Sequence, residues 1–213
     1  MSKVSCIVLA AGAGRRMGHD ENKIFIKLGN KSIIQWTLSN IEQVKAVSEV
    51  ILVVADGEAA YMKQHIASLG LSKSIKIITG GKERQDSVYA GLQAVSDDMD
   101  IVLVHDGARP LAKPELFKSV IEGAKTHGAV TIGVPSTDTI KRVDIDGQVL
   151  ETLNRNELMN IQTPQGFQKD IFKEAQETAK KDAYLGTDDV SLVEYIGKDV
   201  YILDGDYENI KVT

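Results

Sequence analysis

Short runs of aliphatic and β-branched residues alternate with longer stretches of helical periodicity, and this alternation constrains the fold more than any other feature. Five such runs lie at residues 4–10, 50–55, 75–79, 100–105 and 129–134. The intervening residues 31–44, 58–70, 86–95 and 114–128 place apolar side chains three and four positions apart. Uninterrupted apolar strands are typical of a parallel sheet that is covered on both faces. The sequence therefore predicts an α/β fold with a doubly wound, mostly parallel sheet.

The regular alternation stops at residues 138–155. Asp146-Gly147 lies between two strand-like runs, which is a hairpin signal. A hairpin has no natural place inside a doubly wound sheet, so we expect it to project as a β-arm. An isolated two-stranded arm is only marginally stable, and we therefore expect the arm to pack on a second subunit of a homodimer. The apolar residues that such packing would cover are Ile140, Val143, Val149, Leu150 and Leu153.

Two helices, near residues 169–181 and 187–196, and a strand at 200–205 follow the arm. We expect residues 1–213 to form one domain.

The chain is 43% hydrophobic and 26% charged, with a net charge of −5 that argues against binding of nucleic acid or anionic membranes. No apolar run approaches the roughly 20 residues that span a bilayer, and the N-terminus has no signal-peptide pattern. We therefore expect a cytoplasmic protein, in which the single cysteine, Cys6, is a core residue.

The stretch "AAGAGRRMG" at residues 10–18 follows the first predicted strand. Small residues such as Gly12 and Gly14 let backbone N–H groups approach an anion closely. The stretch is neither a G-x-G-x-x-G fingerprint nor a Walker A loop, and taken alone it is also compatible with a tight turn. The positive charges of Arg15, Arg16 and Lys23 favour a phosphate site.

Three more loops are expected at the same edge of the sheet, where open α/β proteins bind ligands. "GGKERQDSV" follows the third strand, "HDGARP" the fourth, and "PSTDTIKR" the fifth. Asp106, in the second of these loops, is either a turn former or a ligand for a metal or a hydroxyl group. The basic side chains at several strand ends of an acidic protein predict a substrate with several phosphates.

Together these stretches carry a family resemblance. "LAAGAGRRMG", "GGKERQDSV", "HDGARP", "DTIKR", "NRNEL", "TPQGF", "TDDVSLVE" and "ENIKVT" occur in the order found in the 2-C-methyl-D-erythritol 4-phosphate cytidylyltransferase family of the non-mevalonate isoprenoid pathway, which the sequence resembles. The related ribitol-5-phosphate cytidylyltransferases are the alternative, although "HDGARP" and "NIKVT" favour the first family. This chain departs from the family in reading Asn22-Lys23-Ile24 where Pro-Lys-Gln is frequent. The family also continues past "KVT", and we expect the stop at Thr213 to reflect either a trimmed or a partly disordered C-terminus.

The resemblance implies a Rossmann-like nucleotidyltransferase in which the acceptor phosphate attacks the α-phosphorus of CTP. Transition-state stabilisers would be Arg16 and Lys23, and the pair that holds the acceptor phosphate would be Arg155 and Lys211. The remaining acceptor pocket would comprise Asp106, Arg109, Thr139, Thr163 and Thr187. The CTP site would comprise Ala10, Ala11, Gly12, Gly14, Gly81, Lys82, Arg84 and Ser87. Mg²⁺ would be held mainly by the CTP phosphates, with Asp106 as a candidate ligand.

Simpler roles remain open for three of these residues. Arg155 is also explained as a charge beside the hairpin, Thr163 as a turn residue before Pro164, and Thr187 as a helix cap. Two other classes of function are disfavoured. A dinucleotide-dependent oxidoreductase needs an acidic residue about 20 positions beyond the glycine-rich loop, and Asp56 lies much further along. A non-catalytic nucleotide-binding module leaves "NRN", "TPQ" and "NIKVT" unexplained.

Overall fold

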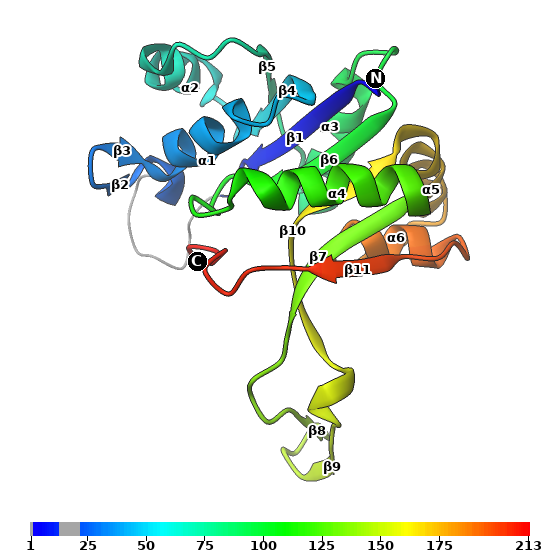
Figure 1. Ribbon diagram of the computed structural model, residues 1–213. Helices are drawn as coiled ribbons and strands as arrows, with labels where there is room; N and C mark the ends of the chain where they lie inside the picture. The colour runs from blue at the N-terminus through cyan, green and yellow to red at the C-terminus, as the bar shows by residue number, and fades with distance from the viewer. Residues whose placement is uncertain (1, 13–21) are drawn as a thin grey trace.

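A seven-stranded sheet forms the centre of the computed structural model, which describes residues 2–12 and 22–213 (Figure 1). The strands lie in the order β11-β7-β10-β6-β1-β4-β5. Their bounds are β1 Val4–Ala10, β4 Val47–Val54, β5 Ser74–Thr79, β6 Ile101–Asp106, β7 Ala129–Pro135, β10 Met159–Gln168 and β11 Tyr201–Asp204. β10 is antiparallel to its neighbours β6 and β7, whereas the other pairings are parallel. The predicted mostly parallel sheet is confirmed.

Helices cover both faces of this sheet. One layer contains α1 (Ile33–Glu42), α2 (Ala59–Ile66) and α4 (Pro114–His127), and the other contains α3 (Arg84–Ala94), α5 (Lys169–Lys181) and α6 (Val190–Tyr195). Because side chains alternate along a strand, Cys6 and Val8 of β1 face the first layer, whereas Ile7 faces the second. Full burial raises the pKa of the Cys6 thiol to about 12, as suits an inert core residue. No helix in the described part of the chain is long and apolar enough to cross a bilayer.

Strand β10 was not predicted, and its composition explains why. Proline cannot donate a hydrogen bond to a sheet, so Pro164 argues against a central strand. The structure accommodates it at a shift in the pairing with β7, where Gln162 pairs with Ile132 but Gln165 pairs with Thr131. The Thr163-Pro164 peptide bond is cis. This irregular point lies beside the end of β6 and therefore beside the predicted ligand edge.

The predicted arm is present and projects from the body of the molecule (Figure 1). It contains the hairpin strands β8 (Lys141–Val143) and β9 (Val149–Thr152) and the short 3-10 helix η3 (Arg155–Glu157). The Asp144 carboxylate closes the turn by accepting the N–H groups of Asp146 and Gln148. Gly147 has a φ of 84°, a left-handed conformation that favours glycine.

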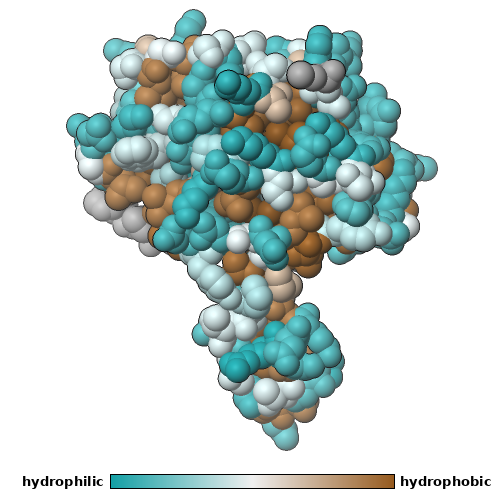
Figure 2. Space-filling model, viewed as in Figure 1, coloured by the Kyte–Doolittle hydropathy of each residue, from teal (hydrophilic) through white to brown (hydrophobic). Residues whose placement is uncertain are grey.

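The arm exposes apolar side chains, which appear among polar ones in Figure 2. Val143, Val149 and Leu150 are each at least half exposed, and Ile145 in the turn is 99% exposed. Ile140 and Leu153 are partly covered. Isolated exposed apolar residues are ordinary, but a cluster of them on a two-stranded arm is typical of an interface. The homodimer expected from this pattern stays a prediction.

Candidate active site

Asp106 is the last residue of β6 and lies almost buried at the carboxyl edge of the sheet. The Lys211 Nζ atom lies 2.9 Å from its Oδ2 atom, and the Arg109 Nε atom lies 3.6 Å from the same oxygen. The Arg84 Nε atom lies 3.9 Å from Oδ1. Three cationic groups from separate segments therefore meet at one carboxylate. The fold brings together four of the predicted site residues.

These cations decide the charge state of Asp106. Burial alone would raise the pKa of its carboxyl group, but Lys211, Arg84 and Arg109 outweigh that effect and hold the pKa below its ordinary value of 3.8. The group is therefore a carboxylate at neutral pH and can accept hydrogen bonds from hydroxyl groups. The side chain takes no part in the turn that follows, which is closed by the Asp106 backbone carbonyl and the Arg109 N–H.

Arg84 is fixed by a second carboxylate. Its Nη2 atom lies 2.7 Å from Oδ2 of Asp189, which is almost fully buried just before α6. The Gln165 Oε1 atom accepts the backbone N–H groups of Asp189 and Val190 at 3.1 and 3.2 Å. Gln165 therefore caps the start of α6 and holds Asp189 in place for Arg84.

Thr163 supports Asp106 from β10. Its Oγ1 atom accepts the backbone N–H of Asp106 at 3.0 Å and lies 3.1 Å from Nδ1 of His105. Burial lowers the pKa of His105 to about 3, so the imidazole is neutral. The Thr163 hydroxyl therefore holds the end of β6 in place. This contact goes beyond the simpler role of a turn residue before Pro164.

The segment after β11 carries Lys211 to Asp106, and Asn209 anchors that segment. Its side-chain Nδ2 donates to the Gln162 Oε1 atom at 3.1 Å and to the Thr163 carbonyl at 3.0 Å. Its own carbonyl accepts Arg109 Nη1 at 2.6 Å. Two residues further along is Lys211. The fully buried side-chain amide of Asn209 therefore anchors the backbone segment that contacts Arg109 and carries Lys211.

The loops that follow β1 and β5 lie side by side. A Cβ atom added to Gly80 would lie 2.6 Å from Ser87 Oγ and 3.1 Å from Ala11 Cβ, so glycine permits this close approach. Within the second loop, the Gly81 N–H donates to Ser87 Oγ, and the Ser87 hydroxyl donates to the Glu83 carbonyl, both at 3.1 Å. Ser87 therefore shapes the predicted nucleotide loop from within.

Asn22 places Lys23 beside the first of these loops. Its Nδ2 atom donates to the Ala10 carbonyl at 3.0 Å and to Oε2 of Glu58 at 3.2 Å. Its Oδ1 atom accepts the Ile24 N–H at the start of the 3-10 helix η1 (Lys23–Phe25). Asn22 thus fills the position where proline is frequent in the family. Gly14, Arg15 and Arg16 lie outside the described residues.

Three predicted acceptor residues do not join the Asp106 cluster within one chain. Thr139 lies two residues before β8 and Arg155 begins η3, so both are on the projecting arm, and both are exposed. Thr187 is exposed on the approach to α6. It does not cap that helix, because Gln165 and Asp188 bind the N–H groups there. Lys82 is exposed on the β5 loop, and Gly12 is exposed on the β1 loop.

The sequence predictions missed Asp189, Gln165 and Asn209. All three lie in stretches that carry the family resemblance, "TDDVSLVE", "TPQGF" and "ENIKVT". Their positions in those stretches could have marked them as site residues. A single sequence does not, however, distinguish a buried polar side chain from an exposed one. In the part of the chain that the structure describes, no group of three or more His, Cys, Asp or Glu side chains is arranged to hold a metal ion.

Comparisons with known proteins agree with this geometry. The family model described as 2-C-methyl-D-erythritol 4-phosphate cytidylyltransferase matches residues 4–213. The enzymes of that name from Pelotomaculum thermopropionicum and Alkaliphilus metalliredigens are 45% and 47% identical to this chain, and the matches cover 100% of it and 90% and 88% of their own lengths.

A solved structure extends the comparison to the fold. The crystal structure of 4-diphosphocytidyl-2C-methyl-D-erythritol synthase from Anaerococcus prevotii is 32% identical and has a TM-score of 0.89. The match covers 99% of this chain and 92% of that one. The chain therefore belongs to the 2-C-methyl-D-erythritol 4-phosphate cytidylyltransferase family.

Proposed function

We propose that the Asp106 cluster is the acceptor site of this cytidylyltransferase. The enzyme joins CMP from CTP to 2-C-methyl-D-erythritol 4-phosphate, and pyrophosphate is the second product. The contact between Lys211 and Asp106 carries the proposal for the site, since it places a carboxylate and a cation together at the ligand edge of the sheet. A polyol phosphate needs a carboxylate to bind its hydroxyl groups and a cation to bind its phosphate.

The two kinds of charge suit the two ends of the acceptor. The Asp106 carboxylate accepts hydrogen bonds from the acceptor's hydroxyl groups, whereas Lys211 and Arg109 attract its phosphate. Lys211 and Arg109 both face the Oδ2 atom of Asp106, whereas Arg84 is also paired with Asp189. Because two cations meet at that one carboxylate oxygen, an anionic acceptor is bound there more favourably than a neutral polyol.

The reaction needs no general base. A phosphate monoester has a second pKa of about 6 and is mostly dianionic at neutral pH, so it is already a nucleophile. The enzyme must instead bring two anions together and neutralise the charge on the transferred phosphoryl group and on the leaving pyrophosphate. Arg16 and Lys23 are proposed for this task. The neutral, fully buried His105 is a structural group.

The neighbouring loops are proposed to bind CTP. Residues 10–12 and 80–82 bring small residues and backbone N–H groups to the same edge, which suits a triphosphate and a compact pyrimidine. The fixed arrangement of Gly80, Gly81 and Ser87 supports this role, because those contacts leave no room for larger side chains. Lys82 and Gly14 complete the proposed set. Arg84 joins this loop to the acceptor pocket through Asp106.

Mg²⁺ is proposed to arrive with CTP. Asp106 is the candidate protein ligand, but Lys211 and Arg109 already face its Oδ2 atom, and one carboxylate among three cations is not a cage for a resident metal ion. The triphosphate oxygens are better ligands. When bound there, Mg²⁺ neutralises charge that develops on the phosphates.

A homodimer is proposed to complete the acceptor pocket. Thr139, Lys141 and Arg155 lie on the arm, away from the Asp106 cluster of the same chain (Figure 1). The exposed apolar residues of the arm favour packing on a second copy, and twofold symmetry would let each arm reach the other subunit's site.

The decisive experiment follows pyrophosphate release from CTP and Mg²⁺ with two acceptors, 2-C-methyl-D-erythritol 4-phosphate and ribitol 5-phosphate. We expect a much higher kcat/KM for the first acceptor. Release without any acceptor is expected to be negligible. A higher kcat/KM for ribitol 5-phosphate would overturn the acceptor assignment and leave the nucleotidyl-transfer chemistry standing.

A further inference from the structure

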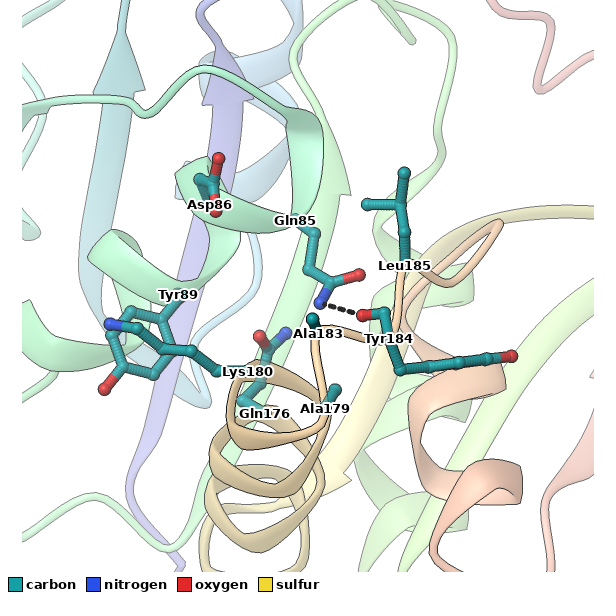
Figure 3. Close-up of a pocket in the computed structure, with 9 residues that line it drawn as sticks. All are labelled: Gln85, Asp86, Tyr89, Gln176, Ala179, Lys180, Ala183, Tyr184 and Leu185. Atoms are coloured by element: carbon teal, nitrogen blue, oxygen red, sulfur yellow. Dashed lines mark hydrogen bonds between the residues drawn. The ribbon is translucent and has the colours of Figure 1, made fainter.

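A groove between α3 and α5 lies on the helical layer behind the nucleotide loop. It encloses about 410 Å³ and is closed on one side by residues 183–185, which follow α5 (Figure 3). That volume is in the range of small-molecule sites. Within residues 2–12 and 22–213, no residue of the proposed catalytic machinery lines it.

Gln176 supplies an unpaired donor at this groove. The residue is 1% exposed, and its Nε2 atom has no hydrogen-bond partner among the described residues. In Figure 3 the side chain points from α5 toward Gln85. Gln85 does not satisfy it in this arrangement, in which its Nε2 atom donates to the Tyr184 carbonyl at 2.9 Å and its Oε1 atom accepts the Gly186 N–H at 3.0 Å. A buried N–H without a partner is unfavourable, so this amide is poised for an acceptor atom from outside the chain.

Lys180 supplies a cation at the rim. Its Nζ atom lies 4.0 Å from the centroid of the Tyr89 ring, and it takes part in none of the ion pairs found within the described residues. The ring face holds the ammonium group at the groove without neutralising its charge. The nearby Asp86 carboxylate is directed to the start of α3, where it accepts the Glu83 N–H. The groove therefore offers one donor at its floor and one cation at its rim, and the methyl groups of Ala179 and Ala183 also line it.

We propose that this groove is a second small-molecule site, which binds a compact organic anion. A carbonyl oxygen of the ligand accepts from Gln176 Nε2, and its phosphate or carboxylate group lies against Lys180. None of the residues that line the groove belongs to the described CTP loops at 10–12 and 80–82, and the Arg84 side chain of α3 is directed to Asp189 and Asp106 instead. Gln85 and Leu185 are shared by the groove and a smaller hollow beside Arg84.

Uridine 5′-monophosphate is a suitable probe, since it carries ring carbonyls and a phosphate. The side-chain amide resonance of Gln176, assigned by its loss in Gln176→Met, should shift when the probe is added at millimolar concentration in the presence of saturating CTP. Orotate tests whether a carboxylate replaces the phosphate, and uridine tests the need for an anion. Gln176→Met and Lys180→Met should each weaken binding at least tenfold. Lys173→Met, a change on the same helix at a residue paired with Glu177, should not.

The thermal stability of Gln176→Met shows whether the Gln176 amide serves a ligand or holds the fold. If the Gln176 amide serves a ligand, Gln176→Met removes an unpaired buried donor, and the Tm of the free protein should stay equal or rise. A fall of several degrees would mean that the amide holds the fold, and would overturn the proposal. So would equal probe affinity in Gln176→Met and wild type, displacement of the probe by CTP, or no amide shift with either anion.

Discussion

Lys211 and Asp106 lie 2.9 Å apart, Nζ to Oδ2, and this ion pair joins the segment after the last strand to the end of β6. The segment is held by main-chain contacts as well, because the Val212 N–H donates to the Ala108 carbonyl at 2.9 Å. The acceptor site therefore depends on a part of the chain that contributes little to the core. Mutations in that segment should affect acceptor binding before they affect the fold.

Asp106→Asn should abolish most acceptor binding and lower stability by about 3 kcal/mol at neutral pH, because it leaves partly buried cations without their carboxylate. The pKa of Asp106 is lower in the folded protein than its ordinary 3.8, so its charge stabilises the fold at neutral pH. That contribution is lost as the pH falls below about 3.8 and through the folded-state pKa. Urea unfolding of wild type and variant should therefore show a difference that narrows toward pH 3. A difference that is constant with pH would contradict the ionised state proposed for Asp106.

Asn209→Ala should raise the KM for the methylerythritol phosphate at least tenfold and leave the KM for CTP nearly unchanged. The reason is that its side-chain amide anchors the segment whose backbone carbonyl accepts from Arg109 and which carries Lys211, and both of these cations face the acceptor rather than the CTP loop. Loss of the two buried hydrogen bonds should cost about 2 kcal/mol of stability. The exposed neighbour Glu208 offers a matched control, and Glu208→Ala should change neither KM. Equal increases in both KM values would show that Asn209 supports the whole fold.

Periodicity was enough to predict the parallel strands and both helical layers, because buried strands such as β1 and β6 are continuous apolar runs. Periodicity was not enough to predict β10, because its sequence contains Pro164 and several polar residues. The strand is irregular at this point, but it still pairs with β7 on both sides of the register shift. Asp106, Arg109 and Arg84 were predictable from their places at strand ends. The contacts of Lys211, Asp189 and Asn209 were not, since they depend on where distant segments dock, and no local pattern encodes that.

Arg16→Ala and Lys23→Ala should lower kcat on the order of a hundredfold or more, with a much smaller effect on CTP affinity. Both residues are proposed to stabilise charge that develops on the transferred phosphoryl group, and Asn22 fixes the start of the helix that carries Lys23. Single-turnover kinetics at saturating CTP would measure the chemical step directly. Near wild-type turnover in either variant would remove that residue from the proposed mechanism. Lys27→Ala, a change at an exposed residue just beyond η1, is the control and should leave kcat unchanged.

The arm gives a prediction about assembly. Val143, Ile145, Val149 and Leu150 expose apolar surface on two short strands, and packing against a second copy would bury it. Light scattering at micromolar concentration should give the mass of a dimer. Ile145→Asp, placed at the most exposed of these positions, should shift the equilibrium toward monomer without unfolding the body of the protein. A monomeric wild type would end the dimer proposal.

If each arm completes the other subunit's pocket, Lys23→Ala and Arg155→Ala should complement one another. Each homodimer lacks one required group in both sites and should be nearly inactive. In a mixed dimer, one pocket takes wild-type Lys23 from one chain and wild-type Arg155 from the arm of the other, while the second pocket lacks both. Mixing the two variants under subunit exchange should therefore restore up to about one quarter of wild-type activity, since about half of the dimers are mixed and each has one intact site of two. Mixing Lys23→Ala with Lys211→Ala is the matched control and should restore nothing, because both residues belong to the body of one chain and no pocket regains both. A dimer that shows no complementation would return Arg155 to its own subunit's site or remove it from catalysis.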